Sequence, residues 1–380
     1  MDTANRGLAR WYWVHKWSSL ICTAFVLLAC ITGLPLVFAE ELDSLGHAHA
    51  GAADESSWLD FDTLLQRVQA ARPQAVPQFV IREPTTPGIT VVGMGKRVDA
   101  PLVESEQVQL DNATGEILAA GGEFDGVLGV LAQLHIELFA GQLGTLFLGL
   151  MTVFLLIALI SGVVIYVPFM GNRTYERPPA RSSQRQRWSW LHNGLGMVLA
   201  VWLFTVALTG AINTVGAPII QLWLMTGVRD AVASDTVSVE ANATLSSFEQ
   251  AYRRAARQLP DSDFYFAMFP GTEFSSDRHY LIFQTGRSPL ASRLFKPVIV
   301  NGYSGEFVGA PEFPWYLKAL LLSQPLHFGD YGGLTLKIAW FVLDVGAIVL
   351  LWSGVALWLR RRRARHQQHG VAAAPAQGVS

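Results

Sequence analysis

Charge is scarce in this sequence. Only 15% of the 380 residues are Asp, Glu, Lys or Arg, whereas an average soluble domain carries about 25%. Hydrophobic residues make up 51% of the chain. This balance excludes a disordered chain, a fibrous chain and an ordinary soluble enzyme, and it indicates that part of the chain lies in a membrane.

Cysteine is nearly absent as well. Cys22 and Cys30 are the only two cysteines, and both lie in one apolar run. In a helix their spacing corresponds to a rise of about 12 Å, which is too long for a disulfide. The sequence also has no CxxC motif and no zinc-ligand spacing, so we interpret both cysteines as apolar packing residues.

The sequence has long runs with almost no ionisable residue. The runs are 18–39, 138–172, 193–228 and 338–359, and only the last contains a charge, Asp344. A membrane helix needs about 20 apolar residues. We therefore predict spans near 18–39, 143–168, 193–213 and 336–359. The stretch 213–228 is predicted to be an interfacial segment in which Pro218 breaks the helix.

Lys and Arg are concentrated beside the ends of these spans. They are Arg6, Arg10, Lys16, Arg173, Arg177, Arg181, Arg185, Arg187, Arg360, Arg361, Arg362, Arg363 and Arg365. Because positive segments stay in the cytoplasm, both termini and the loop at 169–192 are predicted to be cytoplasmic. The net charge of −2 then divides into +11 on that side and −12 in the outer loops, with Asp344 inside the membrane. The first span is longer than a signal core and is predicted to be retained.

The chain contains an internal duplication. The third span repeats the first at a constant offset of 177 residues, and the fourth repeats the second at 192. A histidine and a small-residue pair recur in each repeat, which is hard to obtain by chance. The matches are His15 with His192, Thr32-Gly33 with Thr209-Gly210, His135 with His327, and Ser161-Gly162 with Ser353-Gly354.

Each outer loop is predicted to form a small α+β module. The first has a helix at 60–71 and strands near 78–82, 89–92 and 106–110, then a turn at 112–117 and a last strand. The second has a helix near 246–258, strands near 264–268, 279–285 and 296–300, and a closing turn at 303–307. The predicted segments are 1–39 (N-terminus and first span), 40–125 (first module), 126–172 (amphipathic segment and second span), 173–192 (basic loop), 193–213 (third span), 214–310 (second module), 311–360 (amphipathic segment and fourth span) and 361–380 (tail).

Four of the nine histidines are organised by this duplication. His15 and His192 lie at the cytoplasmic entries of two spans, and His135 and His327 lie just outside the membrane before the other two. The hydrocarbon is about 30 Å thick, so pairing is restricted to histidines on the same face. Two neutral imidazoles from different helices suit six-coordinate haem iron, and without a CxxCH motif the haem would be non-covalent and b-type. Arg10 or Arg187 could pair with propionates, although the positive-inside rule explains both equally well.

The other titratable residues have simpler interpretations. His47 and His49 are predicted to be loop residues, with a weak metal site as the alternative, and His279 lies in a strand. His366 and His369 lie in the basic tail and are predicted to be solvated. Asp344 is interpreted as a structural acid bonded to a neighbour such as Asn213, and a proton relay is the alternative.

The order of spans and modules, the Gly115-Glu116 and Gly305-Glu306 turns, and the Trp-x-x-x-His entry to the first and third spans resemble PepSY-associated membrane proteins. Within them the chain is similar to iron-regulated inner-membrane reductases of ferric siderophores, of the ferrioxamine reductase type. The resemblance covers residues 6–363. It implies an α-helical membrane protein with four spans and two PepSY-like periplasmic modules. It also implies haem bound by His15, His192, His135 and His327, and reduction of a ferric siderophore to release Fe(II).

The electron donor is not encoded in this chain. The loop at 169–192 is short, and there is no GxGxxG motif, so no flavin or nicotinamide domain fits there. A separate reductase, a reduced flavin or a membrane quinol is expected, and no nucleic acid. The acidic outer loops favour a neutral or cationic chelate over an anionic one.

Two other functions compete with this interpretation. A non-enzymatic regulator of a periplasmic protease would need no cofactor, and it leaves the four histidines unexplained. A small-solute or metal transporter is suggested by the repeated spans. Against it, the repeats share one topology instead of being inverted, and only Asp344 places a charge near the midplane.

Overall fold

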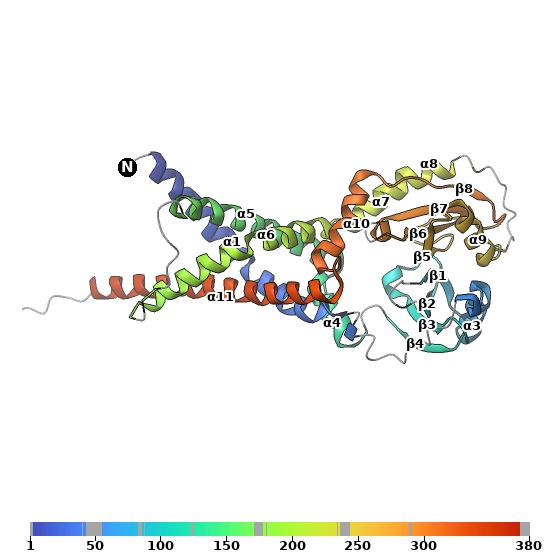
Figure 1. Ribbon diagram of the computed structural model, residues 1–380, viewed down its shortest axis with the longest axis horizontal. Helices are drawn as coiled ribbons and strands as arrows, with labels where there is room; N and C mark the ends of the chain where they lie inside the picture. The colour runs from blue at the N-terminus through green and yellow to red at the C-terminus, as the bar shows by residue number, and fades with distance from the viewer. Residues whose placement is uncertain are drawn as a thin grey trace, which may run out of the picture. The chain divides into compact units, whose positions relative to one another are not determined.

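The computed structural model describes residues 3–39, 41–42, 55–82, 86, 88–122, 125–170, 178–179, 181–233, 235, 244–288 and 291–372. Contacts between residues divide the chain into two compact units. The first, the helical unit, comprises Met1–Val37, Gln133–Thr214 and Leu326–Ser380, and the second, the sheet unit, comprises Phe38–Ala132 and Val215–Pro325. Each unit therefore contains parts of both sequence repeats (Figure 1).

Four long helices form the helical unit. They are α1 (Thr3–Leu36), α5 (Gly141–Met170), α6 (Gln184–Thr214) and α11 (Gly333–Ala372). Their parts at Arg6–Leu36, Gly141–Tyr166, Gln184–Thr214 and Gly333–Arg363 are long and apolar enough to cross a membrane, as predicted. Helices α1, α6 and α11 extend beyond the predicted spans because the basic segments at the ends predicted to be cytoplasmic remain helical. Helix α1 packs extensively on α5, α5 on α6, α6 on α11 and α11 on α1, so α1 lies diagonally opposite α6 in the bundle.

A short helix precedes α5 and another precedes α11. They are α4 (Gly126–Glu137) and α10 (Trp315–Phe328). The chain leaves α4 through Leu138 and Phe139, which have φ angles of 52° and 57°, and it leaves α10 through Gly329 at 76°. Positive φ is costly for residues with a β-carbon and ends a helix sharply. These breaks leave His135 and His327 at the C-terminal ends of α4 and α10.

The break after the third membrane helix is not where the sequence predicted it. Helix α6 ends at Thr214, and α7 (Gly216–Trp223) begins after Val215 alone. Pro218 does not break a helix, because it lies in the first turn of α7, where a missing N–H costs no helical hydrogen bond. A π-helical turn (Leu224–Val228) and α8 (Arg229–Val232) continue α7.

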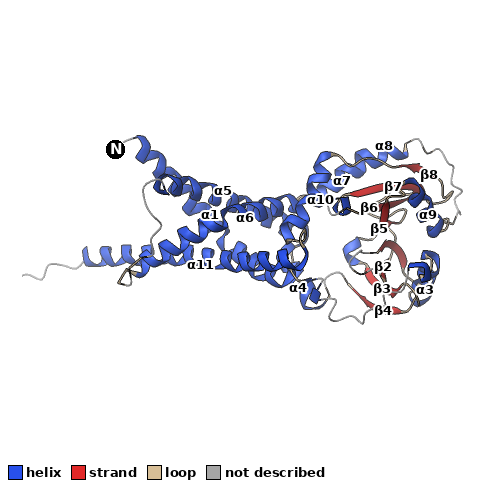
Figure 2. Cartoon of the chain, in the orientation of Figure 1, coloured by secondary structure: helices blue, strands red, loops and turns tan. Residues whose placement is uncertain are grey.

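The sheet unit contains one antiparallel sheet of eight strands in the order β4-β3-β2-β1-β5-β6-β7-β8 (Figure 2). The strands are β1 (Val76–Ile81), β2 (Ile89–Gly95), β3 (Glu106–Asp111), β4 (Ile117–Gly121), β5 (Ser262–Met268), β6 (His279–Gly286), β7 (Phe295–Asn301) and β8 (Phe307–Gly309). Each half supplies four strands. Strands β1 to β7 lie close to the predicted positions, whereas β8 follows a segment that was predicted only as a closing turn. The halves join where β1 pairs with β5, with Phe79 opposite Met268 and Ile81 opposite Phe266. This pairing removes two exposed strand edges, and it makes one sheet where the sequence predicted two modules.

Helices α3 (Phe61–Ala71) and α9 (Phe248–Gln258) close the core of this unit. Their apolar faces, with Phe61 and Phe248, pack against strands of both halves, including Val80 and Ile282. Asp60 and Ser247 are the N-caps of the two helices, and both helices begin where predicted within two residues. Short 3₁₀ turns at Glu55–Ser57, Leu102–Glu104 and Ala291–Arg293 complete the described elements.

Candidate functional site: two histidine pairs in the helical unit

The four histidines singled out by the duplication form two pairs in the helical unit. His15 of α1 and His192 of α6 face each other with ring centroids 6.3 Å apart and planes at 66°. His135 of α4 and His327 of α10 do the same at 6.4 Å and 63°. The pairing expected from the sequence is thus the pairing that the structure brings together. Each pair joins the two repeats, because one member comes from each.

The first pair is anchored through its Nδ1 atoms. His15 Nδ1 lies 2.8 Å from the carbonyl oxygen of Ala158 and 3.5 Å from Ser161 Oγ, both on α5. His192 Nδ1 lies 3.3 Å from the Leu350 carbonyl oxygen and 2.9 Å from Ser353 Oγ, both on α11. Since a carbonyl oxygen only accepts, each Nδ1 carries the hydrogen.

The second pair repeats this arrangement. His135 Nδ1 lies 2.9 Å from the Ala29 carbonyl oxygen and 3.0 Å from Thr32 Oγ1 on α1. His327 Nδ1 lies 3.0 Å from the Val206 carbonyl oxygen and 3.3 Å from Thr209 Oγ1 on α6. In all four rings the tautomer is therefore set, and Nε2 keeps its lone pair as an acceptor or metal ligand.

A glycine follows each of these hydroxyl residues and lies under the imidazole ring. A β-carbon added at Gly162 would lie 3.1 Å from His15 Cε1, and one at Gly354 would lie 3.3 Å from His192 Cε1. The corresponding distances are 3.2 Å for Gly33 with His135 and 3.0 Å for Gly210 with His327. The small-residue pairs were visible in the sequence, but their histidine partners were not, because each partner comes from another helix.

The distance between the paired rings is compatible with a shared metal ion. Two imidazoles on opposite sides of one metal, at metal–nitrogen bonds of about 2.0 Å, have centroids about 6.3 Å apart. Among the described residues no group of three or more His, Cys, Asp and Glu side chains is placed to hold a metal. Two imidazoles are too few for a structural zinc site, but they suffice for haem, whose porphyrin supplies the remaining ligands.

Burial keeps the second pair neutral. His135 and His327 lie outside the four membrane helices, and desolvation lowers the pKa of both. For His327, burial and the neighbouring His135 together lower the pKa to about 4. Neutral imidazoles are the form that binds iron.

Asp344 lies in the bundle near the second pair. Its carboxylate accepts a hydrogen bond from the Cys30 thiol of α1. The sequence suggested Asn213 as the neighbour of Asp344 and did not predict the contact with Cys30. Cys22 and Cys30 are both free thiols. Lys337, which the sequence did not single out, is 4% exposed and has its Nζ 3.6 Å from Asp330 Oδ1. A lysine just before a long apolar run was the available signal.

Of the remaining histidines, only His279 has a described side chain, and it lies apart from the two pairs. His279 is buried in the sheet unit, where its Nε2 lies 2.7 Å from Asp235 Oδ2 and its Nδ1 lies 2.7 Å from Ser276 Oγ. His47 and His49, and the side chains of His366 and His369, lie outside the described residues. Arg10 and Arg187 are exposed, and their pairing with propionates stays a prediction.

The chain is a membrane protein, with four apolar helices of membrane-spanning length and an antiparallel sheet region. Two pairs of histidines lie among its helices. The chain belongs to the PepSY-associated TM region family, whose model matches residues 12–361. Among curated proteins, no match to the chain was found.

Proposed function

We propose that the chain is a b-type di-haem oxidoreductase of the bacterial inner membrane that reduces periplasmic ferric siderophores. Electrons would come from the cytoplasmic side or from the quinol pool, and one electron converts the chelated Fe(III) to Fe(II). The observation that carries the proposal is the pair of opposed imidazoles, found twice, with Nδ1 anchored in all four rings. Bound haem would supply reversible one-electron chemistry.

The chain's own residues would bind and orient the cofactors. His15 and His192 would hold one haem, and His135 and His327 the other. His135 contacts the carbonyl of Ala29, which lies fourteen residues along α1 from His15, so the two sites are separated by about 21 Å along the bundle. By the positive-inside rule, the His15 site lies on the cytoplasmic side and the His135 site on the periplasmic side.

The substrate proposal rests on the resemblance and on charge. Fe(II) has much less preference than Fe(III) for the hard oxygen ligands of a siderophore, so reduction releases the metal. The outer segments carry a net charge of −12, which favours a neutral or cationic ferric chelate. The donor would be a separate reductase, a reduced flavin or a quinol.

An absorption spectrum of the detergent-purified full chain, expressed with ample haem, tests the cofactor. We expect b-type bands that sharpen on addition of dithionite and a content of two haems per chain. A colourless preparation would contradict the proposal and favour a non-enzymatic regulator. The activity is tested separately, by mixing the reduced protein with a ferric hydroxamate chelate and trapping Fe(II) with a chromogenic chelator.

Histidine variants test the ligand assignment. His192→Ala should remove one haem and His327→Ala the other, leaving one haem per chain in each case. His279→Gln is the matched control, since it changes a buried histidine of the sheet unit, and it should retain two haems. Unchanged haem content in both pair variants would refute the assignment.

A further inference from the structure

Each paired histidine contacts a Ser/Thr–Gly pair on another helix. The four Ser/Thr–Gly pairs are Thr32-Gly33, Ser161-Gly162, Thr209-Gly210 and Ser353-Gly354. The contacts are reciprocal within each repeat. Helix α1 carries His15 and holds His135 with Thr32, while α4 and α5 carry His135 and hold His15 with Ser161. The second repeat has the same arrangement between α6 and the two helices α10 and α11.

The hydroxyl of each pair can only accept from the imidazole. Thr209 Oγ1 donates to the Thr205 carbonyl oxygen at 2.7 Å, and Ser353 Oγ donates to the Leu350 carbonyl oxygen at 2.6 Å. Thr32 and Ser161 donate to carbonyl oxygens of their own helices in the same way. With the hydroxyl hydrogen engaged, the oxygen accepts the Nδ1–H. That hydrogen is thus shared between a hydroxyl and a carbonyl oxygen.

Two acceptors on one Nδ1–H have a chemical consequence at Nε2. Withdrawing the hydrogen increases the electron density of the ring and makes Nε2 a stronger donor to a metal. A stronger donor favours the oxidised iron and lowers the reduction potential. The hydroxyls are themselves buried, with Ser161 and Ser353 fully inaccessible, so water does not replace them.

The glycine of each pair sets the position of the ring. The contacts of 3.0–3.3 Å between an added β-carbon and Cε1 are closer than ordinary van der Waals packing. Cε1 lies between the two nitrogens, so a methyl group there would displace Nδ1 from its acceptors and move Nε2 with the rest of the ring. Because glycine has no β-carbon, the imidazole ring can come close enough to the helix for Nδ1 to bond to the neighbouring hydroxyl.

We infer that the four Ser/Thr–Gly pairs are positioning residues. They orient the histidines and tune the reduction potential of the metal that the histidines bind. Each repeat holds one histidine of each pair in place through its own Ser/Thr–Gly pairs. This rests on the proposed haem function. None of these residues is catalytic, since each would act through a histidine.

A redox titration of the purified full chain, followed by the haem spectrum, tests the hydroxyl. Thr209→Val keeps the shape of the side chain and removes the acceptor. We expect one of the two haems to become easier to reduce by a factor of about three to ten, which is about 30–60 mV for one electron. Haem content should remain two. Thr205→Val is the matched control, because Thr205 lies one turn earlier on α6 and its hydroxyl donates to the Val201 carbonyl oxygen of its own helix.

Equal potentials in the Thr209→Val and Thr205→Val proteins, with both haems bound, would overturn the tuning role and leave the proposed function intact. Absence of haem from the wild-type protein would instead overturn the proposed function, and the tuning role with it. If Thr209→Val fails to fold, Ser353→Ala makes the same test at the other site.

A glycine variant tests the positioning role. Gly210→Ala should lower haem content towards one per chain, because the added methyl group presses on His327. Gly196→Ala on the same helix should retain two haems, since its nearest neighbour is Leu350 Cδ1 at 3.8 Å. Full haem content and an unchanged potential in Gly210→Ala would contradict the inference.

Discussion

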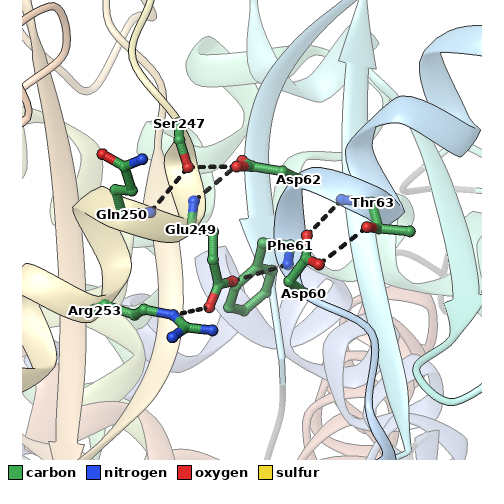
Figure 3. A network of polar contacts seen from close by, with 8 residues as sticks. All are labelled: Asp60, Phe61, Asp62, Thr63, Ser247, Glu249, Gln250 and Arg253. Carbon is green, nitrogen blue, oxygen red and sulfur yellow. Dashed lines mark hydrogen bonds and ion pairs between the residues drawn. The ribbon is translucent and has the colours of Figure 1, made fainter.

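Two acidic side chains connect the N-termini of α3 and α9 in the sheet unit (Figure 3). Asp62 Oδ1 accepts from the backbone N–H of Glu249 at 3.1 Å, and Asp62 Oδ2 accepts from the Ser247 hydroxyl. In return, Glu249 Oε2 accepts from the backbone N–H of Phe61 at 2.9 Å. Each helix therefore satisfies a free N–H of the other, and the two halves of the sheet unit are connected by these reciprocal bonds.

Removing one acid has a calculable cost. Asp62→Ala deletes an anionic acceptor at a helix N-terminus, and a cap of this kind contributes about 0.5–2 kcal/mol. A hydrogen bond to a charged group contributes about 1.5–3 kcal/mol. Because one carboxylate serves both roles, we expect unfolding of the sheet unit to become easier by about 2–3 kcal/mol. For a unit of this size that lowers Tm by about 5–10 °C.

Thermal unfolding of the purified full chain, followed by tryptophan fluorescence, measures the effect. Glu249→Ala should give a loss of similar size, since it removes the equivalent bond in the other direction. Asp263→Asn is the control, because the Asp263–Arg287 pair is exposed and such pairs contribute little. A Tm for Asp62→Ala that equals the control's would refute the reasoning that these bonds connect the two halves.

Two further predictions concern ionisable groups. The hydrogen bond from Arg72 lowers the pKa of Glu106 in the folded chain. The pair therefore stabilises the folded chain at pH values above the unfolded-state pKa of about 4.3. This contribution is lost as the pH falls through the lowered pKa. The unfolding midpoints of wild type and Glu106→Gln should thus differ at pH 7 and approach each other as the pH falls through the lowered pKa of Glu106. Asp344→Asn should leave haem content and the rate of chelate reduction unchanged between pH 6 and 8, as expected for a structural acid; a lost rate with full haem would instead identify a proton relay.

Much of the local structure follows from the sequence alone. The four runs with almost no charge predict the four membrane helices, because their length and composition match the membrane interior. Alternating apolar residues and turn motifs predict the strands, and seven of the eight lie close to the positions expected from the patterns. The break at Val215 was misplaced because a proline in a first turn is compatible with a helix.

The sequence identified the histidines of the candidate site, but it did not identify the residues that contact them. His15 and His327 stood out because each recurs at a constant offset. Nothing in the sequence connects His327 with Thr209-Gly210, since 117 or more residues separate them and the contact depends on how two helices cross. The same holds for Cys30 with Asp344.

The sequence by itself determined the membrane helices, the duplication and the four histidines, because these depend on composition and on spacing along the chain. Only the tertiary structure decided that β1 pairs with β5 in one sheet and that Asp62 and Glu249 bond across its two halves. It also decided that the histidines meet in pairs and that each imidazole has its Nδ1 anchored. These contacts join residues far apart in the chain, and hydrogen bonds of this kind form only at distances of about 3 Å, which helix packing and strand register control.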